Sequence, residues 1–393
     1  MRVLMTGGGT GGHINPAVAI ANTIKKNHPQ AEIAFVGTRR GKEKELVPKE
    51  GYPLYFVEVD GIRRSLSPKN IKALYLACVS PLRARKLLQQ YRPDLVVGTG
   101  GYACWPVMRA AKRLGIPSAV HESNALAGLA IKGLQDHVDR IFINFEQTAG
   151  YFKKKHHAKI MRVGNPLRDG FGGISYGDAR KKLGLREGEQ MVLSFGGSLG
   201  AERINAAVLD LMEEYAASHP NVKVIHACGT VKYAAVHEEF CRRGLDALSN
   251  VTLTPYIYDM PTRMAAADVV ICRAGAMTIS ELALMKKACV MIPSPNVTDN
   301  HQYKNAKALA DQGAAVLLEE KDMEPGRLTK EVAAVLSDRE TRVRMEQSIA
   351  SFARADANRL IYDELMRLMA QSGQREWAGD PLTEIPTPDV LPE

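Results

Sequence analysis

The chain has 393 residues, of which 45% are apolar, 24% charged and 6% aromatic. At roughly one to two hundred residues per domain, this length predicts two domains or three, and the ordinary glycine and proline content excludes collagen-like and low-complexity chains. The net charge of +9 suits nucleic acid, an anionic membrane or phosphorylated ligands, and charge alone does not choose among them.

The cysteines and the hydropathy pattern bear on location. None of the six cysteines belongs to a CxxC pair or a zinc-ligand spacing, so we expect reduced thiols in a reducing compartment. The apolar start of the chain gives way to glycine at Gly7, too early for a signal peptide, and the sequence has no apolar run of about eighteen residues. We therefore expect a cytoplasmic protein without a membrane-spanning segment.

Short apolar runs alternate with amphipathic stretches through the N-terminal half. The runs predict buried strands at 3–5, 33–36, 95–97, 118–120 and 140–143, and helical periodicity marks stretches such as 16–27 and 82–90. Strands that alternate with helices are typical of βαβ units, so we expect a parallel sheet.

The pattern starts again after Gly164, where the Asn165-Pro166 step breaks regular structure. Further strands are predicted at 191–195, 223–226, 252–253, 268–271 and 289–292. Each half opens with a strand, a glycine cluster and a helix, so we expect an α/β protein of two Rossmann-like domains that face each other across a cleft. Residues 340–370 are predicted helical, and the acidic, proline-rich tail 371–393 is predicted disordered.

The first glycine cluster is the strongest local signal. Gly7-x-Gly9-x-x-Gly12 lies between a predicted strand and a predicted helix, where backbone amides can cradle a phosphate. A P-loop is excluded because His13 stands where Lys would follow. An NAD site would need an acid near Thr38, and arginines stand there instead, so NADP is a minor alternative. The other alternative for this cluster is a glycine-rich turn that binds no ligand.

His13 lies at the start of the first helix. A lone histidine is more often structural than catalytic, but a helix N-terminus disfavours the charged imidazole, and a neutral ring can accept a proton. His13 is therefore a candidate general base.

Two further glycine-rich turns precede helices in the second half. Gly196-Gly197-Ser198 offers backbone amides and a hydroxyl to a diphosphate. Gly275 opens the segment Ala276-Met277-Thr278-Ile279-Ser280-Glu281, in which Glu281 could accept hydrogen bonds from both ribose hydroxyls. A capping or solvated role is the alternative for Glu281.

Other polar clusters stand where predicted strands end, and we expect them at the ligand-binding edge of each sheet. They are Gly100-Gly101-Tyr102, His121-Glu122-Ser123-Asn124 and Asp299-Asn300-His301-Gln302. No Asp-x-Asp pair follows a strand, so a metal-bridged diphosphate is not supported. His156 and His157 follow three lysines and are interpreted as a solvated run, not a metal site.

One amphipathic stretch combines apolar residues at helical spacing with basic ones. A helix packed in the core and an interfacial anchor on anionic lipid are both open readings, because such residues can do either. The candidate membrane-facing residues are Ile71, Lys72, Leu74, Tyr75, Leu82, Arg83, Arg85 and Lys86.

Taken together, these motifs resemble those of the MurG family of peptidoglycan glycosyltransferases. The resemblance covers about residues 1–368 and includes the run from Thr6 to His13, His121–Ala125, Val163–Arg168, Gly196–Ala201, Cys272–Ala276 and His301-Gln302. It departs from the family at Leu199 and His301, where some members carry Gln, and at Ser123, where Gln is common. A role for Leu199 in ligand binding would have to come from its backbone.

The resemblance implies a GT-B fold. An acceptor- and membrane-side domain would span 1–164 and be completed by a C-terminal helix at about 341–370, and a donor domain would span 165–340. It also implies that an inverting, metal-independent enzyme without a cofactor moves GlcNAc from UDP-GlcNAc to the 4-hydroxyl of MurNAc in lipid I (undecaprenyl-pyrophosphoryl-MurNAc-pentapeptide). The product would be lipid II, made at the cytoplasmic face of the cell membrane.

The family's donor-binding positions carry over residue by residue. They fall on Thr10, Gly11, Gly12, Asn124, Arg168, Ser198, Ile257, Ala276, Met277, Thr278, Ile279, Ser280, Glu281 and Gln302. Two alternatives are kept: a related enzyme that glycosylates another lipid such as diacylglycerol, and a basic nucleic-acid-binding module. The second lacks a recognisable nucleic-acid-binding signature and leaves the glycine-rich helix starts unexplained, so we expect no nucleic acid partner.

Overall fold

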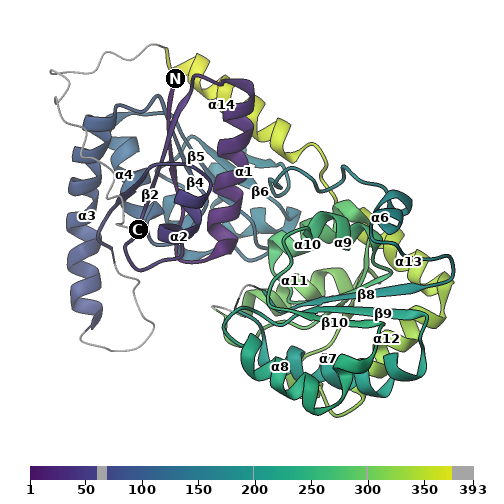
Figure 1. Ribbon diagram of the computed structural model, residues 1–393. Coiled ribbons are helices and arrows are strands. Elements are labelled where there is room, and N and C mark those ends of the chain that lie inside the picture. The colour runs from purple at the N-terminus through teal and green to yellow at the C-terminus, as the bar shows by residue number, and fades with distance from the viewer. Residues whose placement is uncertain (60–68, 198, 298–299, 374–393) are drawn as a thin grey trace. The chain divides into compact units, whose positions relative to one another are not determined.

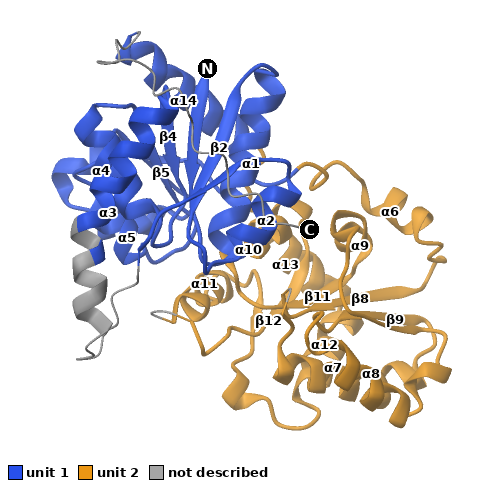
Figure 2. Ribbon diagram, turned by 60° about the vertical axis from the view of Figure 1, so that its left-hand side comes forward, with its two compact units in different colours: residues 1–168, 356–393 blue, residues 169–355 orange. Residues whose placement is uncertain are grey.

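The computed structural model describes residues 1–59, 69–197, 199–297 and 300–373, without the side chains of 69–75, 77 and 78 (Figure 1). The chain divides into two compact units (Figure 2). Unit 1 consists of Met1–Arg168 and the segment that returns from Asp356, and unit 2 consists of Asp169–Ala355.

Unit 1 is built on a parallel sheet. Its described strands follow the order β3-β2-β1-β4-β5-β6-β7, and every neighbouring pair is parallel. They are β1 (Arg2–Thr6), β2 (Glu32–Gly37), β3 (Leu54–Phe56), β4 (Leu95–Gly98), β5 (Ser118–Glu122), β6 (Arg140–Ile143) and β7 (Ile160–Arg162). The central strands are buried on both faces, which explains their continuous apolar sequences.

Helices cover both faces of this sheet. One face packs against α1, α2 and the C-terminal helix α14, and the other packs against α3, α4 and α5. The described helices are α1 (Gly11–Asn27), α2 (Glu43–Lys49), α3 (Lys69–Tyr91), α4 (Cys104–Leu114), α5 (Leu129–Leu134) and α14 (Ala357–Ser372), with 3₁₀ turns η1 (Glu146–Tyr151) and η2 (Lys154–Lys159). No described helix is both long and apolar enough to cross a membrane.

Unit 2 repeats the plan with a second parallel sheet. Its described strands run in the order β10-β9-β8-β11-β12-β13. They are β8 (Gln190–Phe195), β9 (Val222–Ala227), β10 (Val251–Thr254), β11 (Val269–Cys272), β12 (Ala288–Met291) and β13 (Val316–Leu317).

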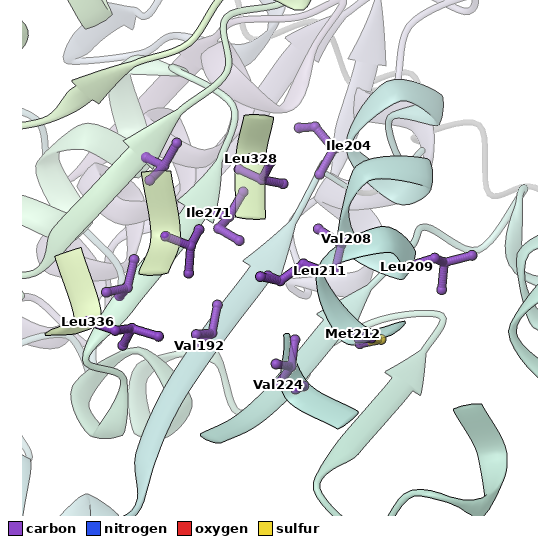
Figure 3. Close-up of a cluster of buried hydrophobic side chains, with 14 of the residues drawn as sticks. Val192, Ile204, Val208, Leu209, Leu211, Met212, Val224, Ile271, Leu328 and Leu336 are labelled. Carbon is purple, nitrogen blue, oxygen red and sulfur yellow. The ribbon is translucent and has the colours of Figure 1, made fainter. Parts of the chain in front are cut away.

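One core of unit 2 lies between its sheet and the helices α7, α12 and α13. Figure 3 shows Val208 and Leu211 of α7 and Leu328 of α12 beside Val192 and Ile271 of the sheet. The described helices of unit 2 are α6 (Tyr176–Lys182), α7 (Glu202–Glu214), α8 (Tyr233–Arg242), α9 (Met260–Ala266), α10 (Ala276–Met285), α11 (His301–Ala310), α12 (Arg327–Ser337) and α13 (Arg339–Ala350), with 3₁₀ turns η3 (Ala216–Ser218), η4 (Leu245–Ala247) and η6 (Glu320–Asp322).

The ten strands predicted from apolar runs are all present, with ends shifted by up to two residues. Strands β3, β7 and β13 were not predicted; they have three, three and two residues and lie at sheet edges. A run this short carries too little periodicity to be recognised before its neighbour in the sheet is known.

The expectation of one C-terminal helix at about 341–370 is wrong. Helix α13 ends at Ala350 within unit 2, and α14 begins at Ala357 within unit 1. The polar stretch between them carries the chain from one unit to the other, so the two helices bury their apolar faces in different cores. Helix α14 also extends through 371 and 372, where disorder was predicted, and the rest of the tail, 374–393, lies outside the described residues.

Candidate active site

Each sheet has a topological switch point, at which successive strands stop being added to one side of the first strand and continue on its other side. In unit 1 the chain moves outward from β1 to β3 and then returns to β4, directly beside β1. In unit 2 it moves from β8 to β10 and returns to β11, beside β8. Loops at such a point leave the sheet in opposite directions, and open α/β sheets bind ligands there. The glycine clusters after β1, β8 and β11 all stand at these two points.

In unit 1, the loops after β1 and β4 touch each other. The amide of Gly8 donates to the carbonyl oxygen of Gly100 at 3.2 Å. Gly101 has φ +85°, and a Cβ atom built on it would lie 2.3 Å from the oxygen of Gly8. Any other residue there would push the loops apart, which accounts for the Gly100-Gly101 pair.

His13 lies against this contact. Its Nδ1 is 3.0 Å from the carbonyl oxygen of Gly8. Because a carbonyl can only accept, we assign the proton to Nδ1, which leaves Nε2 of the neutral ring free of hydrogen and able to accept one. A Cβ atom on Gly100 would lie 2.7 Å from Cδ2 of the ring. The glycine therefore makes room for the imidazole, and the half-buried ring has one defined orientation.

Thr10, Gly11 and Gly12 form the start of α1, where Thr10 and Gly12 are exposed and Gly11 is partly exposed. Thr10 is extended and serves as the N-cap residue, and its carbonyl accepts from the amides of His13 and Ile14 at 3.1 and 3.2 Å. No acidic side chain is present in the first turn. The positive end of the helix dipole is thus open to an anion such as a phosphate.

Asn124, after β5, is oriented by a buried carboxylate. Glu122 is only 4% exposed, and its Oε1 accepts from both the backbone amide and the side-chain amide of Asn124, each at 3.0 Å. Its Oε2 accepts from the amide of Gly128 at 2.8 Å. Glu122 stood in a recognised polar cluster, but its orienting role was missed because the contacts depend on the fold of the following loop.

His121, in the same cluster, is part of the core. It is fully buried, and its Nε2 donates to the carbonyl oxygen of Gly164 at 2.8 Å. Burial lowers the pKa of His121 to about 4. The ring is therefore neutral, and its Nε2 proton is already used in a hydrogen bond within the core. A ligand-binding role for His121 is not favoured.

The second glycine loop, after β8, interlocks with the turn after β9. Gly200 has φ +75°, and a Cβ atom there would lie 1.9 Å from the carbonyl oxygen of Cys228. Gly229 has φ +91°, and its Cβ atom would lie 2.2 Å from the nitrogen of Gly200. Leu199 projects outward at 57% exposure, and Ser198 lies outside the described residues.

A chain of buried side chains supports these turns. Asn205 of α7 donates from Nδ2 to the oxygen of Cys228 at 3.0 Å, and its Oδ1 is 3.1 Å from Nε2 of His226. Nδ1 of His226 is 3.0 Å from the hydroxyl of Ser194 on β8. Burial lowers the pKa of His226 to about 4, so the network is neutral at physiological pH.

The third glycine-rich turn, after β11, leads into α10. Asn305 is fully buried and donates to the carbonyl oxygen of Ala274 at 3.2 Å, which holds the turn before the helix. Arg273 bonds the carbonyl oxygen of Ile292 at 3.2 Å and pairs with Glu320 at 2.5 Å. The Arg273 side chain therefore makes contacts within unit 2, although the residue stands in a glycine-rich turn.

The remaining donor candidates of unit 2 follow from α10 and α11. Within α10, Ala276, Ile279 and Ser280 are buried, whereas Met277, Thr278 and Glu281 are partly exposed. Gln302 accepts through Oε1 from the amide of Ser294 at 2.9 Å. Ile257, after the edge strand β10, is buried at 5% exposure.

Arg168 is exposed and is the last residue of unit 1 before the chain enters unit 2. The residue before it is clamped by the start of α14. The side chain of Asn358 accepts from the amide of Leu167 at 3.0 Å and donates to its carbonyl oxygen at 2.8 Å. This reciprocal pair gives the backbone at Arg168 a defined position.

The candidate membrane-facing stretch belongs to α3. Leu82 is 57% exposed, Arg83, Arg85 and Lys86 are exposed, and Arg83 pairs with Glu58. Leu76, on the same helix, is buried in the core. The side chains of Ile71, Lys72, Leu74 and Tyr75 lie outside the described residues, so the membrane role stays a prediction.

Nothing in the described part of the chain brings three or more His, Cys, Asp or Glu side chains together as a metal site.

The prediction that His156 is solvated is wrong. His156 is 6% exposed, and its Nε2 lies 2.7 Å from Asp136, whose carboxylate also pairs with Lys153 and Lys155. These contacts and the hydrogen bonds within them lower the pKa of Asp136.

Comparison with known proteins agrees with this architecture. Residues 3–143 match the glycosyltransferase family 28 N-terminal domain, and residues 191–361 match the family 28 C-terminal domain. The two parallel-sheet units and these family matches together define an α/β glycosyltransferase of the GT-B type. The expectation of an α/β protein with two Rossmann-like parallel-sheet domains is confirmed.

Full-length relatives make the assignment more specific. An Acetivibrio thermocellus protein named UDP-N-acetylglucosamine–N-acetylmuramyl-(pentapeptide) pyrophosphoryl-undecaprenol N-acetylglucosamine transferase is 42% identical over 369 residues, which cover 94% of this chain and 98% of that protein. A protein of the same name from Caldanaerobacter subterraneus is 40% identical over 92% of this chain and 98% of its own. The crystal structure of Acinetobacter baumannii MurG superposes with a TM-score of 0.74 at 28% identity, covering 93% and 99% of the two chains. The chain belongs to the MurG family.

Proposed function

We propose that this protein transfers GlcNAc from UDP-GlcNAc to the 4-hydroxyl of MurNAc in lipid I and so produces lipid II for peptidoglycan synthesis. The observation that carries the proposal is the full-length similarity to relatives named for this transferase activity. The glycine loops at both switch points support it, because glycine-rich helix starts suit a nucleotide diphosphate.

We assign donor binding mainly to unit 2, residues 169–355, and acceptor binding to unit 1. In this assignment the amides after β8 and at the start of α10 bind the diphosphate, Glu281 holds the ribose and the backbone of Ile257 reads the uracil. Arg168, Asn124, Gln302 and the exposed start of α1 complete the donor set. The resemblance to the family carries these roles. The residues lie in the loops and helices that follow the strands of the two sheets, which is compatible with these roles.

The proposed reaction is a single displacement that inverts the anomeric carbon. The 4-hydroxyl oxygen of MurNAc attacks that carbon, its proton passes to Nε2 of His13, and UDP leaves with the electron pair of the broken bond. Helix N-termini, Arg168 and Ser198 stabilise the charge on the leaving diphosphate, which is the task a metal ion performs in other enzymes. We therefore expect transfer without an added metal or cofactor.

The central experiment incubates the purified protein with radiolabelled UDP-GlcNAc and a lipid I analogue in EDTA, and follows label into the lipid. Transfer in EDTA is the expected result. UDP-GlcNAc binding without transfer would retain the donor assignment and overturn the acceptor. Diacylglycerol serves as the competing acceptor, and label in that lipid alone would favour a different lipid glycosyltransferase.

His13→Ala tests the proposed base. Loss of the base is expected to lower kcat by about 10²–10⁴-fold while the KM for UDP-GlcNAc changes little. A normal kcat with a raised KM would make His13 a binding residue instead.

We further propose that the protein is peripheral and works at the cytoplasmic face of the cell membrane, with α3 against anionic lipid. The exposed Leu82 beside Arg83, Arg85 and Lys86 supports this orientation. Each basic residue near such a surface contributes about 1 kcal/mol. Replacing Lys72, Arg83, Arg85 and Lys86 by Glu should abolish binding to vesicles that contain anionic lipid, and unchanged binding would contradict the proposal.

A further inference from the structure

A buried carboxylate lies behind the first glycine loop. Glu43, the first residue of α2, is fully buried. Its Oε2 accepts from the backbone amide of Gly9 at 2.8 Å, and its Oε1 accepts from the amide and the hydroxyl of Thr38 at 2.7 and 2.8 Å. The side chain therefore joins the loop after β1 to the loop after β2.

The hydrogen bond to Gly9 reaches the same peptide group that holds His13. That group consists of the carbonyl of Gly8 and the amide of Gly9. Its amide donates to Glu43, and its carbonyl oxygen lies 3.0 Å from Nδ1 of His13. Glu43 and His13 are thus connected through one peptide unit, although 30 residues separate them in the sequence.

The surroundings leave space for this carboxylate. A Cβ atom on Gly8 would lie 2.6 Å from Oε1 of Glu43, one on Gly41 would lie 2.0 Å from Oε2, and one on Gly37 would lie 2.4 Å from Cγ. Two loop glycines and the last residue of β2, also a glycine, therefore surround one acidic side chain. The Glu43 carboxylate fits there only because none of these three positions carries a side chain.

The carboxylate of Glu43 can influence His13 by polarising the peptide group between them. A hydrogen bond to an ionised acceptor is roughly twice as strong as a neutral one, and hydrogen bonds in a chain polarise one another. A negative charge on the amide side makes the carbonyl of Gly8 a better acceptor for Nδ1–H. This favours the ring form whose Nε2 can take a proton, and it stabilises the positive ring that results.

We propose that Glu43 is a positioning residue for the transfer reaction, acting on His13 through the Gly8–Gly9 peptide. The inference rests on the proposed function, in which His13 is the base. During the reaction the acceptor's O–H bond breaks, its proton binds Nε2 and its oxygen bonds the anomeric carbon, while UDP departs with the electron pair. The proton on Nδ1 stays in place, and Glu43 exchanges no proton in the step.

A double-mutant cycle tests this coupling. Glu43→Gln keeps the size of the side chain but places an NH₂ group against an amide, either that of Gly9 or that of Thr38. In the native His13 background we expect kcat to fall by about tenfold, less than the loss of a carboxylate that contacts its histidine directly. In the His13→Ala background we expect a change below about twofold, because the group through which Glu43 acts is gone.

The control variant is Glu45→Gln on the same helix, which removes the same charge from an exposed position and should leave kcat unchanged. UDP affinity and the thermal midpoint are measured for every variant to confirm folding. An equal loss from Glu43→Gln in both backgrounds would overturn the proposal and reduce Glu43 to a structural residue.

A spectroscopic measurement does not depend on turnover. In ¹⁵N-histidine-labelled wild-type protein with a neutral ring, we expect His13 to carry its proton on Nδ1, and in Glu43→Gln we expect the Nε2–H form to increase. A wild-type ring protonated on Nε2 would overturn the proposal. Absence of transfer by the wild type would instead contradict the proposed function, and full activity of His13→Ala would overturn both the base assignment and the role of Glu43.

Discussion

Three of the histidines show how burial separates structural from chemical roles. His121 and His226 are fully buried, and both of their ring nitrogens face hydrogen-bonding groups. His13 is half-buried, and only its Nδ1 is bonded to the glycine loop by the contact described above. Histidine is therefore a core residue at two of these positions and a candidate base at the third, and the surroundings of each ring decide which role it has.

The buried rings predict a pH dependence of stability. His226 has a pKa of about 4 in the folded protein and about 6.5 when unfolded. Between these values the unfolded chain binds a proton that the folded chain does not, so acid favours unfolding. His226 alone should lower the free energy of unfolding by about 2 kcal/mol from pH 7 to pH 5.

The check is denaturant unfolding at both pH values, for the wild type and for His226→Gln. The glutamine can still bond Ser194 and Asn205 but does not titrate. Its loss of stability between pH 7 and pH 5 should be smaller than that of the wild type by about 2 kcal/mol. An equal loss in the two proteins would show that His226 does not contribute.

Glu281 is the residue whose substitution best separates binding from chemistry. If its carboxylate bonds the ribose, Glu281→Ala should raise the KM for UDP-GlcNAc by roughly 10–100-fold and leave kcat nearly unchanged, since a hydrogen bond to a charged group is worth about 1.5–3 kcal/mol. Titration of the variant with UDP by calorimetry provides the measurement. Wild-type affinity for UDP would contradict the ribose role.

At the scale of elements, the interlocked turns of unit 2 connect sequence to site geometry. Helix α7 can begin where it does because Gly200 and Gly229 allow two backbones to meet without side chains. Asn205 then fixes the carbonyl of Cys228 from within the helix. The glycine loop after β8 is thus held by the packing of two turns and not by its own sequence alone.

Gly200→Ala should be more damaging than an alanine at another glycine of positive φ. Gly244 has φ +68° and nothing within 4 Å of its Cβ position, so Gly244→Ala adds backbone strain only. Gly200→Ala adds a clash with Cys228 as well, and should cost about 2 kcal/mol more in unfolding free energy and weaken UDP binding. Urea unfolding of both variants is the measurement, and equal destabilisation would contradict the interlocking role.

At the scale of the whole molecule, the two units differ in how their cores are assembled. The hydrophobic core of unit 2 that Figure 3 shows is made entirely of residues between Val192 and Met345. A core of unit 1 includes Ile361, Leu365 and Leu368 of α14, which the chain supplies only after it has completed unit 2. Glu364 of α14 also pairs with Arg140 on β6. One unit is continuous in sequence, and the other is not.

This difference predicts how fragments behave. Residues 169–355 should fold alone and unfold cooperatively, whereas 1–168 should lose several kcal/mol of stability because α14 is missing, given about 2–5 kcal/mol for each large buried side chain removed. Circular dichroism during urea unfolding of the two fragments is the measurement. Equal stability of 1–168 with and without the residues from Asp356 onward would contradict the prediction.

The sequence by itself determined the ten strands with clear apolar runs, the two α/β halves, the glycine-rich helix starts and the family. Those features depend on residues that are close together in the chain: apolar runs, glycines before a helix, and motifs in a fixed order. His13 could be selected as the candidate base for the same reason, because it directly follows the first glycine cluster.

Only the tertiary structure decided which groups act on these residues. Glu43 meets Gly9 across 34 residues, Asn358 clamps Leu167 across 191, and α13 and α14 belong to different cores. None of these pairings leaves a local periodicity, because each depends on where strands and loops lie once the sheets have formed. The support of the candidate site is therefore a product of long-range packing, whereas its location follows from local sequence.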